Sequence, residues 1–445
     1  MVKLRRTLAV SLLVAAFALV TGIPARAQTG NETPKATEVG VTPTEIHIGA
    51  MADVDNPFAP GLFQGAVDGV KGAAAYVNSK AGGGGIAGRK LVVDFIDSRL
   101  NPNESRNGVI KACSQDLALV GTASLFLSNV DDEINCKDQA GAATGLPDMG
   151  AIVTGVPETC SPVSFPVLGS QLDCATKDQH PQTYLANNGD SKYLLKTHKN
   201  DLHGAMVVSN DTKDANRGGA IQADAAIKAG VKADQNVTRS GKDPQSAYTA
   251  IVNKMKSDAS NYSLNVLAVN SEIELRSEAQ LQGLTDPNIV WACTEACYDK
   301  SAKQNANVMN GTYVTLSYLP FEEANSNATE KNFVKYVGPD KIDGFAVSGW
   351  VAGLEFAQAV KNTVAKHGVN GLTRANLIDG IKQIKDFNAG GMIGTVPVAT
   401  RGLSPCFVLV ELKDAKWVRV YPKKKGTFDC KPSNLVHVQA DLIGT

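Results

Sequence analysis

The side chains that could bind a small polar molecule follow the ends of predicted strands. Hydroxyl and backbone N–H groups hold a carboxylate, acids hold an ammonium group, and apolar walls take an uncharged side chain. Two acids, Glu272 and Glu295, follow strands that are predicted to end near Val269 and Ala292. The other candidates lie in loops after earlier strands and are Phe58, Thr122, Ser124, Ala151 and Thr154. Caps and turns use the same polar residue types, so each candidate has an ordinary structural alternative.

Patterns that resemble motifs of enzymes lack an essential part. Gly83-x-Gly85-x-x-Gly88 has the spacing of a dinucleotide fingerprint, which needs a strand before it and a helix after it. Here a helix is predicted before it and a strand after it, so the run predicts a flexible turn. Gly88-Arg89-Lys90 lacks the Ser or Thr of a phosphate-binding loop.

The histidines also lack a catalytic pattern. They are His47, His180, His198, His203, His367 and His437. Neither an H-E-x-x-H spacing nor a G-x-S-x-G nucleophile motif occurs. We therefore expect no catalytic residue, no cofactor and no metal site, and we do not expect an enzyme.

The cysteine content predicts disulfide bonds, because an even count in an exported chain is typical of them. The eight cysteines are Cys113, Cys136, Cys160, Cys174, Cys293, Cys297, Cys406 and Cys430. Pairing in sequence order is our prediction among 105 possible connectivities, because each pair would then flank one strand or loop. Cys406 and Cys430 would tie the ends of a hairpin segment.

Cys293 and Cys297 have a second interpretation as half of a metal site. A structural zinc site usually needs four nitrogen or sulfur ligands, and no partner cluster of Cys or His stands nearby. A disulfide is the favoured interpretation, and its ring would stiffen the loop that carries Glu295.

The first 27 residues have the features of a secretory signal. A basic start (Lys3, Arg5 and Arg6) precedes an apolar core at 8–20, and an Ala-x-Ala site ends at Ala27 before Gln28. A membrane anchor is the alternative, but the apolar core is shorter than the roughly 20 residues that a span needs. No cysteine stands at the cleavage site for lipid attachment. We expect a soluble mature protein in the periplasm or outside the cell envelope.

The charge of the chain gives no sign of nucleic-acid binding. It has 44 basic and 44 acidic residues, and the predicted signal holds four of the basic residues and no acid, so the remainder carries a net charge of −4. Basic patches, which nucleic-acid binding requires, are not expected from this balance. The remaining length suggests two or three domains.

Strands and helices alternate after a polar, flexible lead-in at 28–41. Predicted strands are 45–50, 91–96, 117–120, 146–149, 205–208, 264–269 and 289–291. Predicted helices are 61–78, 104–114, 129–142, 217–229, 245–258 and 272–282. Such alternation predicts an α/β fold with parallel sheets covered by helices, in which ligands bind beyond the carboxyl ends of the strands.

The last third of the chain adds two helices and a hairpin. Residues 344–366 carry apolar residues at helical spacing, and Thr373 caps a second helix at 374–385. Strands at 407–412 and 417–421 are joined by a short turn and predict the hairpin.

Several of these segments together resemble the periplasmic leucine/isoleucine/valine-binding proteins, the type I solute-binding proteins of ATP-driven importers. The first is 51–113, with its long helix, Gly-Gly-Ile-Ala-Gly-Arg-Lys-Leu turn and second strand. DGFAVSGWVAGLEFAQAV at 343–360 resembles the helix by which the family's chain returns to its first lobe. LTRANLIDGIKQIKDFNAGG at 372–391 resembles the late helix and its Gly-Gly turn, and the Cys406 and Cys430 segment resembles actinobacterial members.

The resemblance implies a two-lobed type I periplasmic-binding-protein fold with three crossings, which we place near Ser170, Pro320 and Leu403. The first lobe would contain 42–170 and 321–402, and the second 171–320 and 403–445. It also implies a monomeric, non-enzymatic carrier that binds a branched-chain amino acid or a related amino acid or carboxylate between the lobes. The carrier would deliver its ligand to the membrane permease of the importer.

In the family, the positions of the candidate residues supply the carboxylate donors, the aromatic wall and the acid for the ammonium group, and Glu295 matches that acid. Two departures leave the ligand open. Gly121-Thr-Ala-Ser replaces a usual Ser-Ser, which leaves the register of the carboxylate donor uncertain by one residue, and Ala215 stands near a usual Tyr. A ligand sensor of the same fold that acts on a separate receptor is one alternative. An exported amidase-like enzyme is another.

Overall fold

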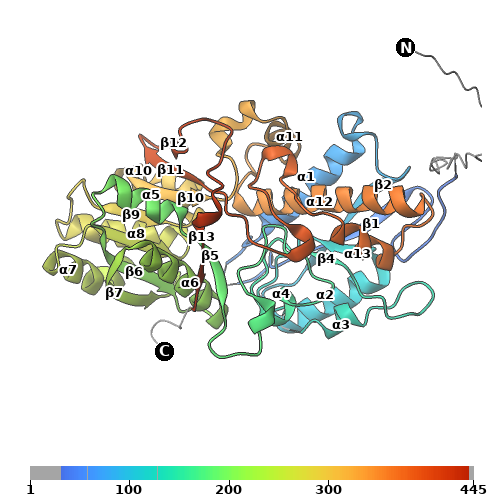
Figure 1. Cartoon of the computed structure of the whole chain (residues 1–445), viewed down its shortest axis with the longest axis horizontal. Helices are drawn as coiled ribbons and strands as arrows, with labels where there is room; N and C mark the ends of the chain where they lie inside the picture. The colour runs from blue at the N-terminus through green and yellow to red at the C-terminus, as the bar shows by residue number, and fades with distance from the viewer. Residues whose placement is uncertain (1–31, 58, 128, 440–445) are drawn as a thin grey trace, which may run out of the picture. The chain divides into compact units, whose positions relative to one another are not determined.

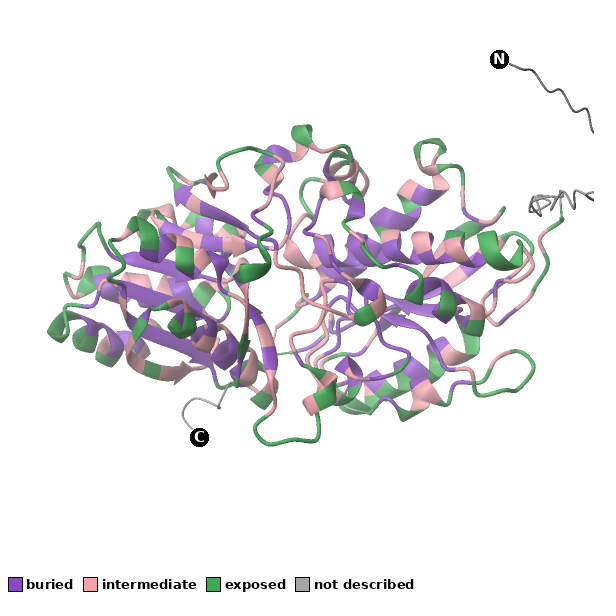
Figure 2. Cartoon of the chain, viewed as in Figure 1, coloured by how far each residue is buried: buried purple, intermediate pink, exposed green. Residues whose placement is uncertain are grey.

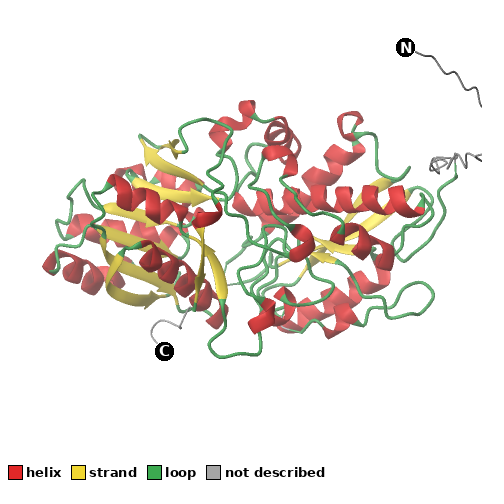
Figure 3. Ribbon diagram, in the orientation of Figure 1, coloured by secondary structure: helices red, strands yellow, loops and turns green. Residues whose placement is uncertain are grey.

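Two mostly parallel sheets flanked by helices form the framework of the protein in a computed structural model that describes residues 32–57, 59–127 and 129–439 (Figure 1). The predicted secretory signal and Phe58 lie outside the described residues. The described residues from Thr33 onward form one compact unit, to which the following description applies. Figure 3 shows the helices beside the strands of each sheet, so the predicted α/β class is confirmed.

The first lobe is built on a four-stranded parallel sheet of order β2-β1-β3-β4. Its strands are β1 (Glu45–Ala52), β2 (Lys90–Asp97), β3 (Ala118–Val120) and β4 (Asp148–Met149). The helices that follow these strands or return to this lobe are α1 (Gln64–Asn78), α2 (Pro102–Gln115), α3 (Asp131–Ile134), α4 (Val156–Thr159), α11 (Ala328–Val337), α12 (Gly344–His367) and α13 (Arg374–Lys382). Buried residues concentrate along the sheet and along α1 and α12 (Figure 2).

Helices α1 and α12 lie side by side because glycines let their backbones approach closely (Figure 1). A Cβ on Gly69 would lie 2.1 Å from the carbonyl oxygen of Ala346, and a Cβ on Gly349 would lie 2.0 Å from that of Ala66. No larger residue fits at either position without separating the helices. This contact sets the position of the first turn of α12.

The second lobe is built on a seven-stranded sheet of order β12-β11-β10-β9-β8-β6-β7. Its strands are β6 (His203–Ser209), β7 (Lys232–Arg239), β8 (Tyr262–Val266), β9 (Val290–Cys293), β10 (Thr312–Leu316), β11 (Val408–Lys413) and β12 (Lys416–Tyr421). Strands β6 to β10 pair in parallel, and the predicted hairpin β11–β12 adds to β10 in the antiparallel direction. The flanking helices are α5 (Gly189–Thr197), α6 (Lys213–Ala229), α7 (Thr249–Ser257), α8 (Val269–Leu281), α9 (Lys300–Gln304) and α10 (Ala306–Met309).

The chain passes between the two sheets three times. It leaves the first sheet after β4, returns after β10 to form α11 to α13, and leaves again before β11. The passing segments bond to one another, because Ser170 N donates to Arg401 O over 2.9 Å and Gly394 N donates to Ser317 O over 3.1 Å. A small antiparallel sheet of β5 (Tyr184–Asn187) and β13 (Leu435–Val438) completes the second lobe. The exact lobe boundaries stay a prediction.

Several predicted elements differ from the structure in their bounds, and one does not form as predicted. The helix predicted at 129–142 is wrong, since only α3 forms there and a bridge between Lys137 and Ala143 turns the chain back around Gly141, whose φ is +86°. The strand predicted at 264–269 ends at Val266, and the helix predicted at 374–385 ends at Lys382. Strands β5, β7, β10 and β13 and helices α4, α5 and α9 to α11 have no counterpart in the sequence analysis.

The described part of the expected lead-in is held in place. Thr37 Oγ1 donates to Leu372 O over 2.6 Å, and the buried Arg89 side chain donates to Lys35 O over 2.8 Å. Residues 35–37 therefore lie against the turn that precedes α13.

The cysteines pair in sequence order, as predicted. The bonds are Cys113–Cys136, Cys160–Cys174, Cys293–Cys297 and Cys406–Cys430. Among the described residues, no helix combines the length and the apolar character that crossing a lipid bilayer requires.

Candidate functional site

A cavity of about 620 Å³ is lined by residues of both lobes. From the first lobe come the loop after β4, including Ala151 and Thr154, and the first residues of α12, including Phe345. From the second lobe come residues that follow β5, β9 and β10. A cavity of this size encloses a small molecule, and it lies at the carboxyl ends of strands, as ligand sites of parallel sheets do.

Glu295 reaches the cavity from the end of β9. The strand ends at Cys293, and the disulfide to Cys297 closes a ring of one short turn around Glu295. Ser317, which follows β10, donates a hydrogen bond from Oγ to Oε2 of Glu295 over 3.0 Å. Burial raises the pKa of Glu295, and the hydrogen bonds from Ser317 offset part of that rise.

A second acid, Asp190, lies on the same side of β10. It belongs to the first turn of α5, and its carboxylate accepts hydrogen bonds from Thr315 Oγ1 over 2.6 Å and from Ser191 N over 2.7 Å. Burial raises the pKa of Asp190 as well. Thr315 and Ser317 are two residues apart, so they face the same side of an extended strand and bring both carboxylates to it.

The N-terminus of α12 supplies a third acid. Asp343 caps the helix, accepting a hydrogen bond at Oδ1 from Ala346 N over 2.7 Å, and it lines the cavity. Burial raises its pKa. Among the described residues, Glu295, Asp190 and Asp343 have no ion-pair partner. Unpaired carboxylates in a partly dry cavity favour a ligand that brings positive charge.

Arg217, on α6, is a positively charged residue that lines the cavity. It forms an ion pair with Asp214, one turn earlier in α6, and its Nη2 donates to the backbone carbonyl of Thr154 over 3.0 Å. Thr154 belongs to the first lobe, so this hydrogen bond joins the two lobes at the cavity. Arg217 can also bind a carboxylate if the pair with Asp214 rearranges.

The structure brings together three of the residues that the sequence pointed to. Ala151, Thr154 and Glu295 line the cavity. Thr122 and Ser124 are buried beside it and do not line it. Thr122 Oγ1 donates to Asp148 Oδ1 over 2.7 Å, and Ser124 Oγ shares a 2.7 Å hydrogen bond with Ser105 Oγ.

Glu272 lies elsewhere because β8 ends earlier than predicted. The chain turns at Val266 and enters α8 at Val269, which places Glu272 in the first turn of that helix and fully buried. Burial raises the pKa of Glu272 to about 7, while Arg276 and Asn265 act in the opposite direction. Phe58 lies outside the described residues, so its proposed role stays a prediction.

The sequence analysis missed Asp190, Arg217, Ser317 and Asp343. Asp343 had a signal, because an aspartate directly before a long apolar-periodic helix is a helix cap. Asp190 and Ser317 follow strands that were not recognised. Arg217 begins the predicted helix 217–229, and no nearby sequence pattern indicated that its side chain lines a cavity.

The fold is that of a two-lobed protein with a cavity between its α/β lobes, lined by both apolar and acidic residues. The family model described as periplasmic binding protein matches residues 45–416, so the chain belongs to this family. Among curated proteins, none matches the chain by sequence.

Solved structures share the fold at low sequence identity. A fatty acid ABC transporter substrate-binding protein from Thermomonospora curvata is 16% identical, with a TM-score of 0.65 over 89% of this chain and 98% of its own. A leucine-binding protein from Thermotoga maritima is 14% identical, with a TM-score of 0.63 over 84% of this chain and 97% of its own. A solute-binding protein from Rhodopseudomonas palustris in complex with p-hydroxybenzoic acid is 14% identical, with a TM-score of 0.63 over 84% of this chain and 95% of its own.

Proposed function

We propose that the protein is the extracytoplasmic substrate-binding component of an ATP-driven importer. The observation that carries the proposal is the cavity between the lobes, with Glu295 at the carboxyl end of β9. The family supports the class of function, since periplasmic binding proteins carry small molecules rather than transform them. The partners would be a small ligand and a membrane permease, and the protein would act as an exported monomer without enzymatic activity.

The ligand is an amino acid or a related small molecule with a protonated amine. Glu295 would bind the positive group, because its carboxylate is half-buried and lacks an ion-pair partner among the described residues. Arg217 and Thr154 lie on the wall that would take a carboxylate. The related structures support no narrower choice, because their names refer to a fatty acid, leucine and p-hydroxybenzoic acid.

Mass spectrometry of the compound released from denatured, purified protein tests this assignment. The expected compound carries an amine and binds again to refolded protein in calorimetry. A panel of amino acids, one fatty acid and p-hydroxybenzoate serves as a comparison. Tight binding of the fatty acid or of p-hydroxybenzoate, with no binding of any amine, would contradict the proposed ligand class but not the carrier function.

A further inference from the structure

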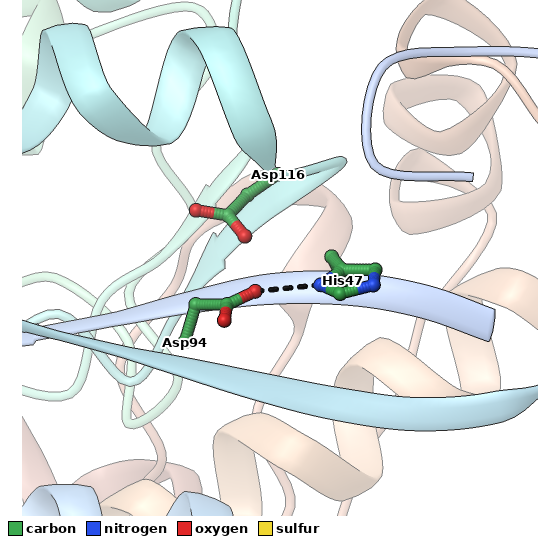
Figure 4. A group of neighbouring side chains, drawn as sticks. All are labelled: His47, Asp94 and Asp116. Carbon is green, nitrogen blue, oxygen red and sulfur yellow. Dashed lines mark hydrogen bonds and ion pairs between the residues drawn. The ribbon is translucent and has the colours of Figure 1, made fainter. Parts of the chain in front are cut away.

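Three side chains meet on the first sheet at a place apart from the cavity. His47 comes from β1, Asp94 from β2, and Asp116 from the segment between α2 and β3 (Figure 4). One ligand atom from each lies within 4.8 Å of the others, and His47 Nδ1 lies 2.8 Å from Asp94 Oδ2. None of the three lines the cavity.

Strand pairing brings these residues together. Gly49, two residues after His47 in β1, is paired with Asp94 in the parallel ladder of β1 and β2. The hydrogen bond from Leu117 N to His47 O, 2.9 Å long, fixes Asp116 beside β1. A Cβ on residue 49 would lie 2.9 Å from Asp116 Oδ2, so the glycine leaves the space that the carboxylate occupies.

Asp116 is the unusual member of the group. Its side chain is fully buried, and neither carboxylate oxygen accepts a hydrogen bond from a described N–H or O–H group. In Figure 4 an Asp116 oxygen points toward Asp94 and His47. A buried acid without a partner is costly unless a cation or a proton neutralises it.

The surroundings carry net negative charge and leave a path for an ion. Glu45 Oε2 lies 3.4 Å from His47 Nε2, and the side chains of His47 and Asp94 are 28% and 36% exposed. Positive charge nearby comes from His47 when it is protonated, from Lys111, and from Arg374, which donates to the backbone oxygen of Asp116 and not to its carboxylate.

We propose that His47, Asp94 and Asp116 bind a divalent transition-metal ion, with Zn²⁺ as the preferred ion. One imidazole nitrogen and two carboxylate oxygens form a donor set that suits Zn²⁺, and water would complete the coordination. The ion would join β1, β2 and the segment before β3, so its role would be to stabilise the first lobe. It would not contact the ligand in the cavity.

Calorimetric titration of Zn²⁺ into EDTA-treated protein that carries no polyhistidine tag tests the proposal. We expect one ion per chain, and a rise in the unfolding temperature on Zn²⁺ addition, because binding to the folded state alone stabilises it. Asp116→Asn and His47→Gln should each weaken Zn²⁺ binding by at least about tenfold, since removal of even an indirect metal contact has an effect of this size. Asp116→Asn keeps the shape of the side chain, and His47→Gln provides a second variant if the first fails to fold.

His203→Gln is the matched control. His203 Nδ1 lies 2.7 Å from Asp234 Oδ2 in the second lobe, an imidazole–carboxylate pair that belongs to no three-residue group of this kind among the described residues. This variant should bind Zn²⁺ like the wild type. The proposal is overturned if wild-type protein takes up no Zn²⁺, in which case a proton shared by Asp94 and Asp116 neutralises the pair. It is equally overturned if Asp116→Asn and His47→Gln bind Zn²⁺ as wild type does, or if His203→Gln loses it to the same extent.

Discussion

Ser317 and Glu295, which follow neighbouring parallel strands, are joined by a 3.0 Å hydrogen bond from the serine hydroxyl to the glutamate carboxylate. The disulfide Cys293–Cys297 restrains the turn of Glu295 from one side, and Ser317 holds its carboxylate from the other. The carboxylate is therefore oriented before a ligand arrives, which lowers the entropy cost of binding.

Glu295→Gln should weaken binding of the natural ligand by roughly ten- to a hundredfold. A hydrogen bond to a charged group contributes about 1.5–3 kcal/mol, and about 1.4 kcal/mol is tenfold in affinity. Glutamine can still accept the hydrogen bond from Ser317, so the fold should be unchanged. Isothermal titration calorimetry measures the effect, with Glu274→Gln on α8, which does not line the cavity, as the control. An affinity within about twofold of wild type, far below the tenfold step, would mean that the ammonium site lies elsewhere.

Affinity for an amine ligand should fall as the pH is lowered. Burial raises the pKa values of Glu295 and Asp190 in the unliganded protein. As the pH falls through these raised values, the carboxyls take up protons and lose the charge that attracts the amine. Ligand binding near those pH values should therefore release protons, which calorimetry in buffers of different ionisation enthalpy detects. Glu295→Gln should show a smaller pH dependence than wild type, and an equal one would remove Glu295 from this explanation.

Glu355→Gln should stabilise the protein more at pH 8 than at pH 5. Glu355 lies on α12, is fully buried, and neither of its carboxylate oxygens has a hydrogen-bond partner among the described residues. Burial raises its pKa to about 8. Below its unfolded-state pKa the carboxyl is neutral in both the folded and the unfolded protein, so its burial does not destabilise the fold through charge. As the pH rises from there through the folded-state pKa, the unfolded protein loses the proton more easily than the folded protein, and the free energy of unfolding falls.

Each unit of pKa difference corresponds to about 1.4 kcal/mol. The increase in the free energy of unfolding caused by Glu355→Gln should therefore be larger at pH 8 than at pH 5, by at least about 1 kcal/mol. Urea unfolding at both pH values measures the gain. Equal effects of Glu355→Gln at pH 5 and pH 8 would show that the carboxyl is not held neutral.

Two of the disulfides should have different roles. Removal of Cys113 and Cys136, 23 residues apart, should lower the free energy of unfolding by about 3 kcal/mol through chain entropy. Removal of Cys293 and Cys297, 4 residues apart, should lower it by only about 2 kcal/mol, but should also weaken ligand binding, because the turn of Glu295 loses its restraint. Double alanine variants, denaturant unfolding and calorimetry compare the pairs. Ligand binding that depends on the first pair and not the second would contradict this assignment.

Ligand should bring the two lobes together. The hydrogen bond from Arg217 to Thr154 joins the lobes at the cavity, and three segments link them. Small-angle X-ray scattering should show a smaller radius of gyration with saturating ligand, as expected for hinge closure. The Glu295→Gln variant at the same ligand concentration is the control. An unchanged scattering profile of wild type with bound ligand would rule out closure.

Local patterns determined the elements with one clear apolar face. The helical spacing along α1 and α12 and the apolar runs of β1 and β2 predicted these elements within a few residues, because burial on one face leaves a period in the sequence. Strand β7, KADQNVTR, lies at the edge of its sheet with no fully buried residue, so it has no apolar run to reveal it. The false helix at 129–142 had helical composition, but the disulfide at Cys136 and the turn at Gly141 redirect that segment.

The residues that line the cavity also fall into those that the sequence indicated and those that only the tertiary structure revealed. Glu295 was predictable as a candidate because it follows a strand of a parallel sheet, and ligands of such sheets bind beyond those strand ends. Thr122 and Ser124 also follow such a strand and do not line the cavity, so this position alone does not decide. Asp190 and Asp343 come from elements distant in sequence, and only the packing of the lobes brings them to the same cavity.

By itself the sequence determined the α/β class and the strand end that carries Glu295, because each depends on residues close together in the chain. Only the tertiary structure decided that Thr122 and Ser124 bond to buried neighbours and that Glu272 lies inside a helix. It alone also placed His47, Asp94 and Asp116 together. Parallel strands are joined through long crossovers, so the residues that meet across such a sheet are far apart in sequence and no local pattern records their contact.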